Sequence, residues 1–266
     1  MAEEHVPASH TAAREFFDRT ADDYSERAEA RTHDLSSLLF TRRRETVLEL
    51  LDESGVRGKL LDFGMGPGVL APSAVERGFE FIGVDISSEM VARAQALGLP
   101  RATYVVGDLD TLEGFRGSVD AVLAIGLIDY LEDPVDGLRR LSACLRPGGV
   151  LIVSFRNSAA LNTLLRGVAK RAWHMFFRRS SWRAESAFVS SVHEKAFSPR
   201  TLESALRHFG LNEFSVRYHN ATPLLFANVP LARRIWSGWL RLDRPVSRWA
   251  PHVLCDAGVL RATKTG

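Results

Sequence analysis

The residues whose types and spacing most clearly suggest chemistry lie in the segment 60–68, which reads Leu-Leu-Asp-Phe-Gly-Met-Gly-Pro-Gly. Three glycines, Gly64, Gly66 and Gly68, alternate directly after an apolar run. Glycine allows the backbone to turn sharply and allows a ligand to lie against bare peptide. Asp62 places a carboxylate beside this loop, where it would repel a phosphate group and attract a cation. The segment therefore predicts a loop that binds a positively charged ligand.

Two further carboxylates follow later apolar runs. Asp85 comes about twenty residues after the glycine loop, where an acidic residue can accept hydrogen bonds from both ribose hydroxyls of a nucleoside. Asp108 is placed to accept from an adenine amino group, with Leu109 supplying a backbone amide. A nucleoside that carries positive charge fits these acids together. S-adenosylmethionine, with its sulfonium and ammonium groups, is such a ligand.

Other interpretations of the same residues are open. The glycines could form only a tight turn, and each acid taken alone could lead a helix or occupy a turn. The pattern Gly66-x-Gly68-x-x-Ala71 also matches a dinucleotide-binding loop, and Asp85 fits that assignment equally well. Against a dinucleotide, Asp62 would face the pyrophosphate. A nicotinamide-dependent oxidoreductase is therefore the alternative enzyme class.

Short apolar runs that alternate with helical patterns must position these residues. Strands are predicted at 59–63, 79–84, 102–106, 119–125 and 150–155. Ser87 and Asp133 are predicted to cap two of the helices between them. The first helix carries Met90, Ala94 and Leu97 on one face, and in the second we expect four residues to point inward, Val135, Leu138, Leu141 and Leu145. The alternation predicts an α/β fold with a doubly wound parallel sheet.

The flanking regions read differently. Residues 9–55 are predicted to be helical, and the polar, aromatic stretch 16–24 suits a helix or lid lying over something. Beyond the fifth strand, 158–183 look helical and a clear helix begins at Ser198. Two last strands are predicted at about 212–218 and 256–262. The 37 residues between them, 219–255, look like an insertion.

These motifs resemble the class I S-adenosylmethionine-dependent methyltransferases, especially the small-molecule group similar to ubiquinone-biosynthesis and magnesium-protoporphyrin methyltransferases. The resemblance is good over about 56–156 and weak over 12–55 and 193–218. It implies a Rossmann-like, doubly wound, seven-stranded sheet with an antiparallel last strand, an N-terminal helical cap and an insertion before the last strand. It implies one domain, 1–266, with a cap at 1–55, a cofactor-binding core at 56–156 and substrate-side helices and closing strands at 157–266.

The resemblance also implies the cofactor site and the reaction. S-adenosylmethionine would be bound by ten residues: Asp62, Gly64, Met65, Gly66, Gly68, Asp85, Ile86, Asp108, Leu109 and Ile125. The expected function is methyl transfer to a small organic acceptor, lipophilic or anionic, with oxygen favoured over nitrogen or carbon. A module that binds the cofactor without transferring its methyl group is a second alternative.

The catalytic residues are less clear from the sequence. Many relatives carry Glu-His where this chain has Asp129-Tyr130, so a role for the family histidine as a base is in doubt here. Candidates for a base or an orienting group are Tyr24, Asp129, Tyr130 and His193. An acceptor that is already anionic needs no base at all.

Composition bounds the partners. Thirty-four basic and 32 acidic residues give a net charge of +2, which by itself points neither to nucleic acid nor to a membrane. Two cysteines without a Cys/His cluster suggest neither a disulfide framework nor a metal site, and a reducing compartment fits best. The N-terminus lacks the pattern of a signal peptide and no apolar stretch is long enough to span a bilayer, so we expect a cytoplasmic protein.

Two segments, 166–183 and 231–250, mix arginines with tryptophan and, in the first, phenylalanine. They could be solvated helices with an apolar inner face, or a pocket or membrane-surface contact for a hydrophobic, anionic or membrane-resident acceptor. An RNA surface is a third interpretation, without any recognisable nucleic-acid module to support it. The expected partner is a small-molecule substrate.

Overall fold

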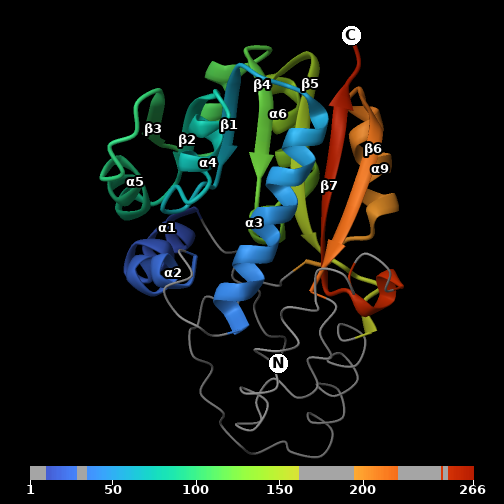
Figure 1. Ribbon diagram of the computed structural model, residues 1–266, viewed down its shortest axis with the longest axis horizontal. Coiled ribbons are helices and arrows are strands. Elements are labelled where there is room, and N and C mark those ends of the chain that lie inside the picture. Colours follow the sequence, from blue (N-terminus) through green and yellow to red (C-terminus); the bar gives the residue numbers. More distant parts are fainter. Residues whose placement is uncertain (1–9, 29–34, 162–194, 221–246, 248–250) are drawn as a thin grey trace, which may run out of the picture.

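A mixed sheet of seven strands forms the centre of the computed structural model, which describes residues 10–28, 35–161, 195–220, 247 and 251–266 (Figure 1). The strand order is β3-β2-β1-β4-β5-β7-β6. The strands are β1 (Lys59–Phe63), β2 (Glu80–Asp85), β3 (Ala102–Val106), β4 (Val119–Ala124), β5 (Leu145–Arg156), β6 (Leu211–His219) and β7 (Ala257–Lys264). The order reverses between β1 and β4, and such a reversal is where open α/β sheets bind ligands.

The direction of the strands confirms the predicted sheet. Strands β1 to β5 pair in parallel, whereas β7 lies antiparallel between β5 and β6. Six of the seven strands differ from their predicted bounds by at most two residues at either end. The exception is β5, which begins at Leu145 rather than Val150 because Val119 already pairs with Leu145 before a register shift. The predicted closing hairpin is thus correct. The ends of β5 and β6 lie at the same edge of the sheet, with β7 between them.

Helices cover both faces of the sheet. The first face packs against α3 (Leu35–Ser54), α4 (Ala71–Glu76) and α5 (Ser88–Gln95), through a core that includes Leu50 and Leu60. The second packs against the 3₁₀ segment η1 (Leu109–Phe115), α6 (Pro134–Cys144) and α9 (Pro199–His208). Because α/β crossovers cover both faces, the inner strands β1 and β4 are almost entirely buried.

The helix caps follow the sequence closely. Ser87 caps α5 by accepting from the Met90 amide, and Asp133 caps α6 by accepting from the amides of Val135 and Asp136. One expectation is wrong: Val135 does not point inward but is 54% exposed, because the apolar face of α6 starts only at Gly137 and Leu138. On α5, Met90 and Ala94 are buried, whereas Leu97 lies beyond the helix and is 42% exposed.

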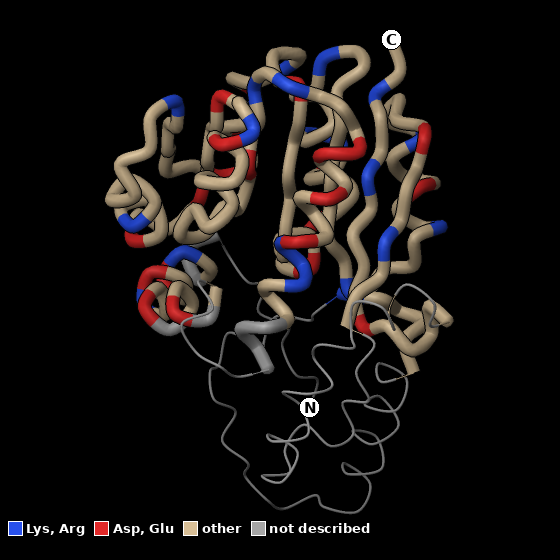
Figure 2. The backbone as a smooth tube through the Cα atoms, viewed as in Figure 1, with Lys and Arg blue, Asp and Glu red and all other residues tan. Residues whose placement is uncertain are grey.

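The N-terminal helices lie at the carboxyl ends of the parallel strands. Residues 9–55 contain α1 (His10–Arg19), α2 (Ala21–Ala28) and α3, and α1 packs against α5 (Figure 1). Lys/Arg and Asp/Glu are interspersed over most of the described elements (Figure 2). None of the described helices is both long and apolar enough for a bilayer span, and the described residues include no His/Cys/Asp/Glu group suited to a metal ion.

Several expectations fall on residues outside the described part of the chain. These are most of the predicted helix at 158–183, the basic and aromatic segments 166–183 and 231–250 except Ser247, most of the insertion at 219–255, and His193.

Candidate cofactor and acceptor site

The glycine loop between β1 and α4 is folded in a way that only glycine adopts easily. Gly64, Gly66 and Gly68 have φ values of 76°, 58° and 77°, in the left-handed region. The amide of Gly64 donates to the Val84 carbonyl at 2.8 Å, which fixes the loop to the end of β2. A Cβ on Gly68 would lie 3.0 Å from the Cβ of Ala94, so this glycine lets α5 pack closely. The loop is a rigid turn whose backbone is exposed to the space beyond the strands.

Asp85 ties the loop to the end of β2. Its carboxylate accepts hydrogen bonds from the amide of Gly66 at 2.8 Å and from the amide of Ser87 at 2.9 Å. The side chain is 8% exposed, and this burial raises its pKa, while the two amides act in the opposite direction. Each carboxylate oxygen has two lone pairs, so Asp85 can accept further hydrogen bonds from a ligand. The geometry is compatible with the predicted ribose contact.

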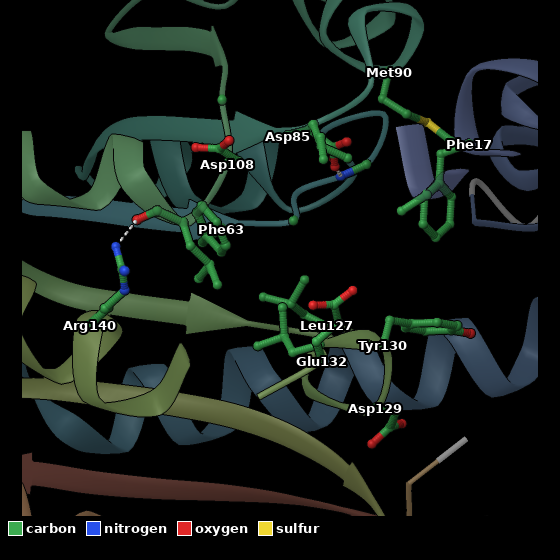
Figure 3. Close-up of a pocket in the computed structure, with 18 of the residues that line it drawn as sticks. Phe17, Phe63, Asp85, Met90, Asp108, Leu127, Asp129, Tyr130, Glu132 and Arg140 are labelled. Atoms are coloured by element: carbon green, nitrogen blue, oxygen red, sulfur yellow. Dashed lines mark hydrogen bonds between the residues drawn. The ribbon is translucent and has the colours of Figure 1, made fainter. Parts of the chain in front are cut away.

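A cavity of about 500 Å³ opens beside this loop (Figure 3). Its size is in the range typical of pockets for small molecules and cofactors. The strand ends and loops contribute Phe63, Gly64, Gly66, Asp85, Ile86, Gly107, Asp108, Leu109, Gly126, Leu127, Asp129, Tyr130 and Arg156, and the helices contribute Ala13, Phe17, Tyr24, Phe40, Arg43, Met90 and Arg140.

The N-terminal helices cover this cavity with aromatic rings. Tyr24 of α2 stacks on the loop, since a Cβ on Gly66 would lie 3.3 Å from its ring. Phe17 meets both Tyr24 and Tyr130 edge to face, with ring centroids 6.3 and 6.1 Å apart. Tyr24 meets Phe40 of α3 in the same way at 5.3 Å. The sequence expectation of a helix lying over something is confirmed, and what it covers is the cavity.

Asp129 is the buried acid on the far side of the cavity. It lies in the 3₁₀ turn η2 (Ile128–Tyr130), directly after β4, and is 8% exposed. Burial raises its pKa to about 6, against the lowering effect of Arg156 and Arg43. Among the described residues, no group donates a hydrogen bond to its Oδ1. A carboxylate with this pKa and a vacant lone pair can accept a proton near neutral pH.

The two tyrosines are less suited to accept a proton. The pKa of Tyr24 is raised, chiefly because the phenol is removed from water, although Arg43 lowers it. Partial burial raises the pKa of Tyr130 as well, although Tyr130 remains 39% exposed. Both phenols therefore stay protonated near neutral pH and can donate hydrogen bonds.

At the other end of the cavity, Asp108 and Leu109 begin η1. The side chain of Asp108 accepts from the Asp110 amide at 3.0 Å, so part of its capacity closes this turn. Arg140 of α6 reaches over from the opposite side (Figure 3), and it donates to the Asp110 carboxylate at 2.9 Å. The strand-end position that was predicted for an adenine contact is therefore part of the cavity wall.

The structure brings together six of the ten predicted cofactor residues in the cavity lining: Gly64, Gly66, Asp85, Ile86, Asp108 and Leu109. The other four, Asp62, Met65, Gly68 and Ile125, do not line it. Of the catalytic candidates, Tyr24, Asp129 and Tyr130 line the cavity, and His193 lies outside the described residues.

Sequence reasoning missed three arginines of this site, Arg43, Arg140 and Arg156. Arg156 ends β5, and the rule that ligands bind at the carboxyl ends of strands could have indicated it. Arg43 is the middle residue of an arginine triplet, 42–44, and nothing in the sequence shows which of the three faces the cavity. Its guanidinium lies over the Phe40 ring at 4.7 Å and beside the end of β4, close to Gly126.

Asp62 lies behind the glycine loop rather than in the cavity wall. It is 1% exposed, and no described residue donates to its Oδ1. Burial raises its pKa to about 7, helped by the charge of Asp85 and opposed by Arg43. This carboxyl therefore titrates near neutral pH, where an ordinary aspartate is fully ionised.

We predict that Asp62→Asn stabilises the ligand-free protein more at pH 8 than at pH 5. The pKa is raised from 3.8 to about 7, so between these values the folded chain holds a proton that the unfolded chain has lost. The free energy of unfolding therefore falls as pH rises through this interval and is level above it. Between pH 5 and about pH 7, the stabilisation gained by Asp62→Asn should therefore grow by about 3 kcal/mol. This corresponds to roughly 6–10 °C in Tm.

Thermal melts of both proteins at the two pH values measure the difference. Asp110→Asn is the matched control, because the Asp110 side chain borders the same cavity but is 84% exposed. An equal gain for Asp62→Asn at both pH values would contradict the raised pKa.

The fold and the site together define a class. A sheet of this order with a glycine loop after β1 and an acid at the end of β2 is that of the S-adenosylmethionine-dependent methyltransferases. The chain belongs to a family described as methyltransferase domain, whose model matches residues 32–216.

Similar proteins of known name agree with this assignment. The chain is 31% identical over 119 residues to the ubiquinone biosynthesis O-methyltransferase of Xanthomonas oryzae pv. oryzae (strain PXO99A), covering 43% of this chain and 49% of that protein. It is 32% identical over 160 residues to the Chromobacterium violaceum protein of the same name, covering 58% and 64%. The chain thus spans about half to two thirds of these relatives.

A solved structure shows the same fold at low identity. Magnesium protoporphyrin IX methyltransferase (ChlM) from Synechocystis PCC 6803, crystallised with bound SAH, superimposes with a TM-score of 0.65 at 16% identity. The match covers 97% of this chain and all of that one.

Proposed function

We propose that this protein transfers the methyl group of S-adenosylmethionine to a small organic acceptor, with a hydroxyl oxygen as the favoured accepting atom. The observation that carries the proposal is the Asp85–Gly66 hydrogen bond at 2.8 Å, which sets an acid and a bare glycine turn together at the cavity wall. A diphosphate would meet the carboxyl of Asp85 there, with that of Asp62 behind the loop, whereas a cationic nucleoside is attracted by both acids.

The residues present suit this cofactor. Asp85 would hold the ribose hydroxyls, and Asp108 with Leu109 would face the adenine. Asp62 has an unpaired buried oxygen next to the glycine loop, so it would stabilise the positive charge of the amino-acid end. Arg43 lines the same part of the cavity and would pair with the cofactor carboxylate. Gly64, Gly66 and Gly68 give the turn its shape, and Met65 and Ile125 support it from the core.

The cofactor supplies a methyl group already activated by its sulfonium, so the protein's contribution is alignment and proton removal. Holding donor and acceptor in line contributes effective molarities on the order of 10⁵–10⁸ M. The aromatic rings of Phe17, Tyr24 and Tyr130 exclude water from the space where the acceptor would lie. Asp129 would take the hydroxyl proton as the acceptor oxygen forms its new bond to carbon, and the phenols of Tyr24 and Tyr130 would orient the acceptor.

Binding and turnover test this proposal separately. Calorimetry with S-adenosylmethionine, S-adenosylhomocysteine and NAD should give heat for the two sulfur compounds and none for NAD. Incubation with methyl-labelled S-adenosylmethionine and a panel of phenols, carboxylic acids and amines should then label at least one acceptor. Heat only for NAD would support the oxidoreductase instead. Cofactor binding without any labelled product across the panel would favour a binding module.

A further inference from the structure

A buried histidine and asparagine at the end of β6 have polar atoms that no described residue satisfies with normal hydrogen-bond geometry. His219 is 4% exposed and Asn220 is 7% exposed. Within the described residues, no hydrogen bond of normal geometry reaches either ring nitrogen of His219 or Oδ1 of Asn220, although the Asn220 side chain lies close enough to His219 to raise its pKa. Leaving a buried polar atom unpaired costs about 1–3 kcal/mol. Three such atoms on two adjacent residues indicate groups that are paired by something other than the described chain.

The sheet places His219 in line with a residue of the cavity wall. Arg156 of β5 is opposite Ala257 of β7, and Ala257 is opposite His219 of β6. Directly opposite residues on neighbouring strands point to the same face, so Arg156 and His219 share a face and lie about 10 Å apart. Only the methyl group of Ala257 stands between them on that row. Arg156 lines the cavity, and Arg43, another lining residue, is close enough to affect the pKa of His219.

The chemistry of the pair restricts what could bind there. Burial lowers the pKa of His219 to about 4 against the raising effect of the Asn220 side chain, and Arg43 lowers it further, so the ring is neutral near pH 7. A neutral imidazole offers one N–H donor and one nitrogen acceptor, and the amide oxygen of Asn220 adds a second acceptor. A carboxylate only accepts, so it could pair with Arg156 and the imidazole N–H but would leave both acceptors unpaired. An ammonium group only donates, and it would also face the charge of Arg43.

We propose that Arg156, which lines the cavity, and the neighbouring Ala257, His219 and Asn220, which do not, form a subsite that extends the acceptor pocket and binds an uncharged group that both donates and accepts hydrogen bonds. A hydroxyl or a carboxamide has this chemistry. The subsite is distinct from the transfer position at Asp129, and it fixes the orientation of the acceptor by a second polar group. This inference rests on the proposed function, because it assigns the group to the methyl acceptor.

The test uses the full chain saturated with S-adenosylhomocysteine and four probes that share one ring: benzyl alcohol, benzamide, benzoate and benzylamine. Dissociation constants are measured by ligand-observed NMR for the wild type, His219→Phe and Ala257→Leu. His219→Phe keeps the ring and removes both nitrogens, whereas Ala257→Leu fills the space and leaves the polar groups. We expect benzyl alcohol or benzamide to bind the wild type at least tenfold more tightly than the charged probes, and each variant to lose about tenfold. If benzyl alcohol binds more tightly than benzamide, the subsite prefers a hydroxyl; the reverse order indicates a carboxamide.

Tyr104→Phe is the matched control, because it removes another buried polar atom without a described partner. Tyr104 lies on β3, at the opposite edge of the sheet from β6. It should leave probe binding unchanged. His219→Phe should also raise the Tm of the ligand-free protein, which a structural histidine would not allow. Asn220→Ala gives a second measurement of the same loss if His219→Phe does not fold.

Three results would overturn the subsite: no binding of either neutral probe to the wild type, tighter binding of a charged probe, or unchanged neutral-probe binding in both variants. The dissociation constant of S-adenosylhomocysteine, measured first, keeps the two proposals apart. Loss of that binding in the wild type counts against the proposed function, whereas normal cofactor binding with any of the three results counts only against the subsite.

Discussion

Asp85→Ala should raise the dissociation constant for S-adenosylhomocysteine about 100-fold, because hydrogen bonds to a charged acceptor contribute roughly 1.5–3 kcal/mol each. The variant removes the proposed partner of the ribose hydroxyls. It also frees the amides of Gly66 and Ser87, which the carboxylate now holds at 2.8 and 2.9 Å. The loss therefore combines a missing ligand contact with a less ordered loop. Calorimetric titration of the purified variant measures it.

Two further variants separate these contributions. Asp85→Asn keeps one oxygen as an acceptor, so we expect an intermediate loss of about tenfold. Asp52→Ala removes an acid whose ion pair with Arg77 lies outside the cavity, and this variant should bind as the wild type does. A dissociation constant for Asp85→Ala within threefold of the wild type would show that the ribose assignment is wrong.

The sheet could be predicted from the sequence because its signals are local and agree with one another. Each parallel strand is a short apolar run, and each following helix starts at a residue that can cap it, as Ser87, Asp133 and Ser198 do. The glycine loop was equally predictable, because the three glycines indicated a sharp turn and all three adopt the left-handed backbone conformation that glycine favours. The prediction that Val135 points inward failed, because it rested on helical periodicity alone. Val135 matches the helical period but lies outside the contact between α6 and the sheet.

The cavity was less predictable because its walls come from distant parts of the chain. Phe17 meets Tyr130 across more than a hundred residues and also meets Tyr24, and only the packing of α1 and α2 brings these rings together. Asp62 shows a different limit. Its position near the end of β1 suggested direct contact with a cationic ligand, but the backbone turn at Gly64 buries it behind the loop. Sequence spacing gives the order of such groups along the chain and not their depth.

His219 illustrates what only the sheet order can reveal. In the sequence it is 63 residues from Arg156 and follows a strand of the closing hairpin, with no motif around it. The insertion of β7 between β5 and β6 places the two in one row. The residues proposed for the acceptor subsite thus lie in the part of the fold with the weakest sequence signal, whereas those proposed for the cofactor lie in the part with the strongest.

Asp129→Asn should lower kcat by about 100-fold or more, the usual range for loss of a positioned acid or base being roughly 10²–10⁴. Asparagine preserves the shape of the side chain but cannot take up the acceptor proton. Because burial raises the pKa of Asp129 to about 6, the wild-type kcat should rise as pH increases through about 6 and then level off. The variant should lack this rise. Turnover of the best acceptor from the labelling panel between pH 5 and 8 measures both effects.

Glu132→Gln is the control for this prediction, since Glu132 lines the same cavity but is exposed to solvent. It should change kcat little and leave the pH profile intact. Both variants should bind S-adenosylhomocysteine normally, which separates a lost proton acceptor from a damaged cofactor site. If Asp129→Asn kept a kcat within threefold of the wild type together with the same rise near pH 6, the proton would have to leave by another group. Tyr24 and Tyr130 could not supply that rise, because their phenols stay protonated across this range. The acceptor would then be one that reaches the site already anionic.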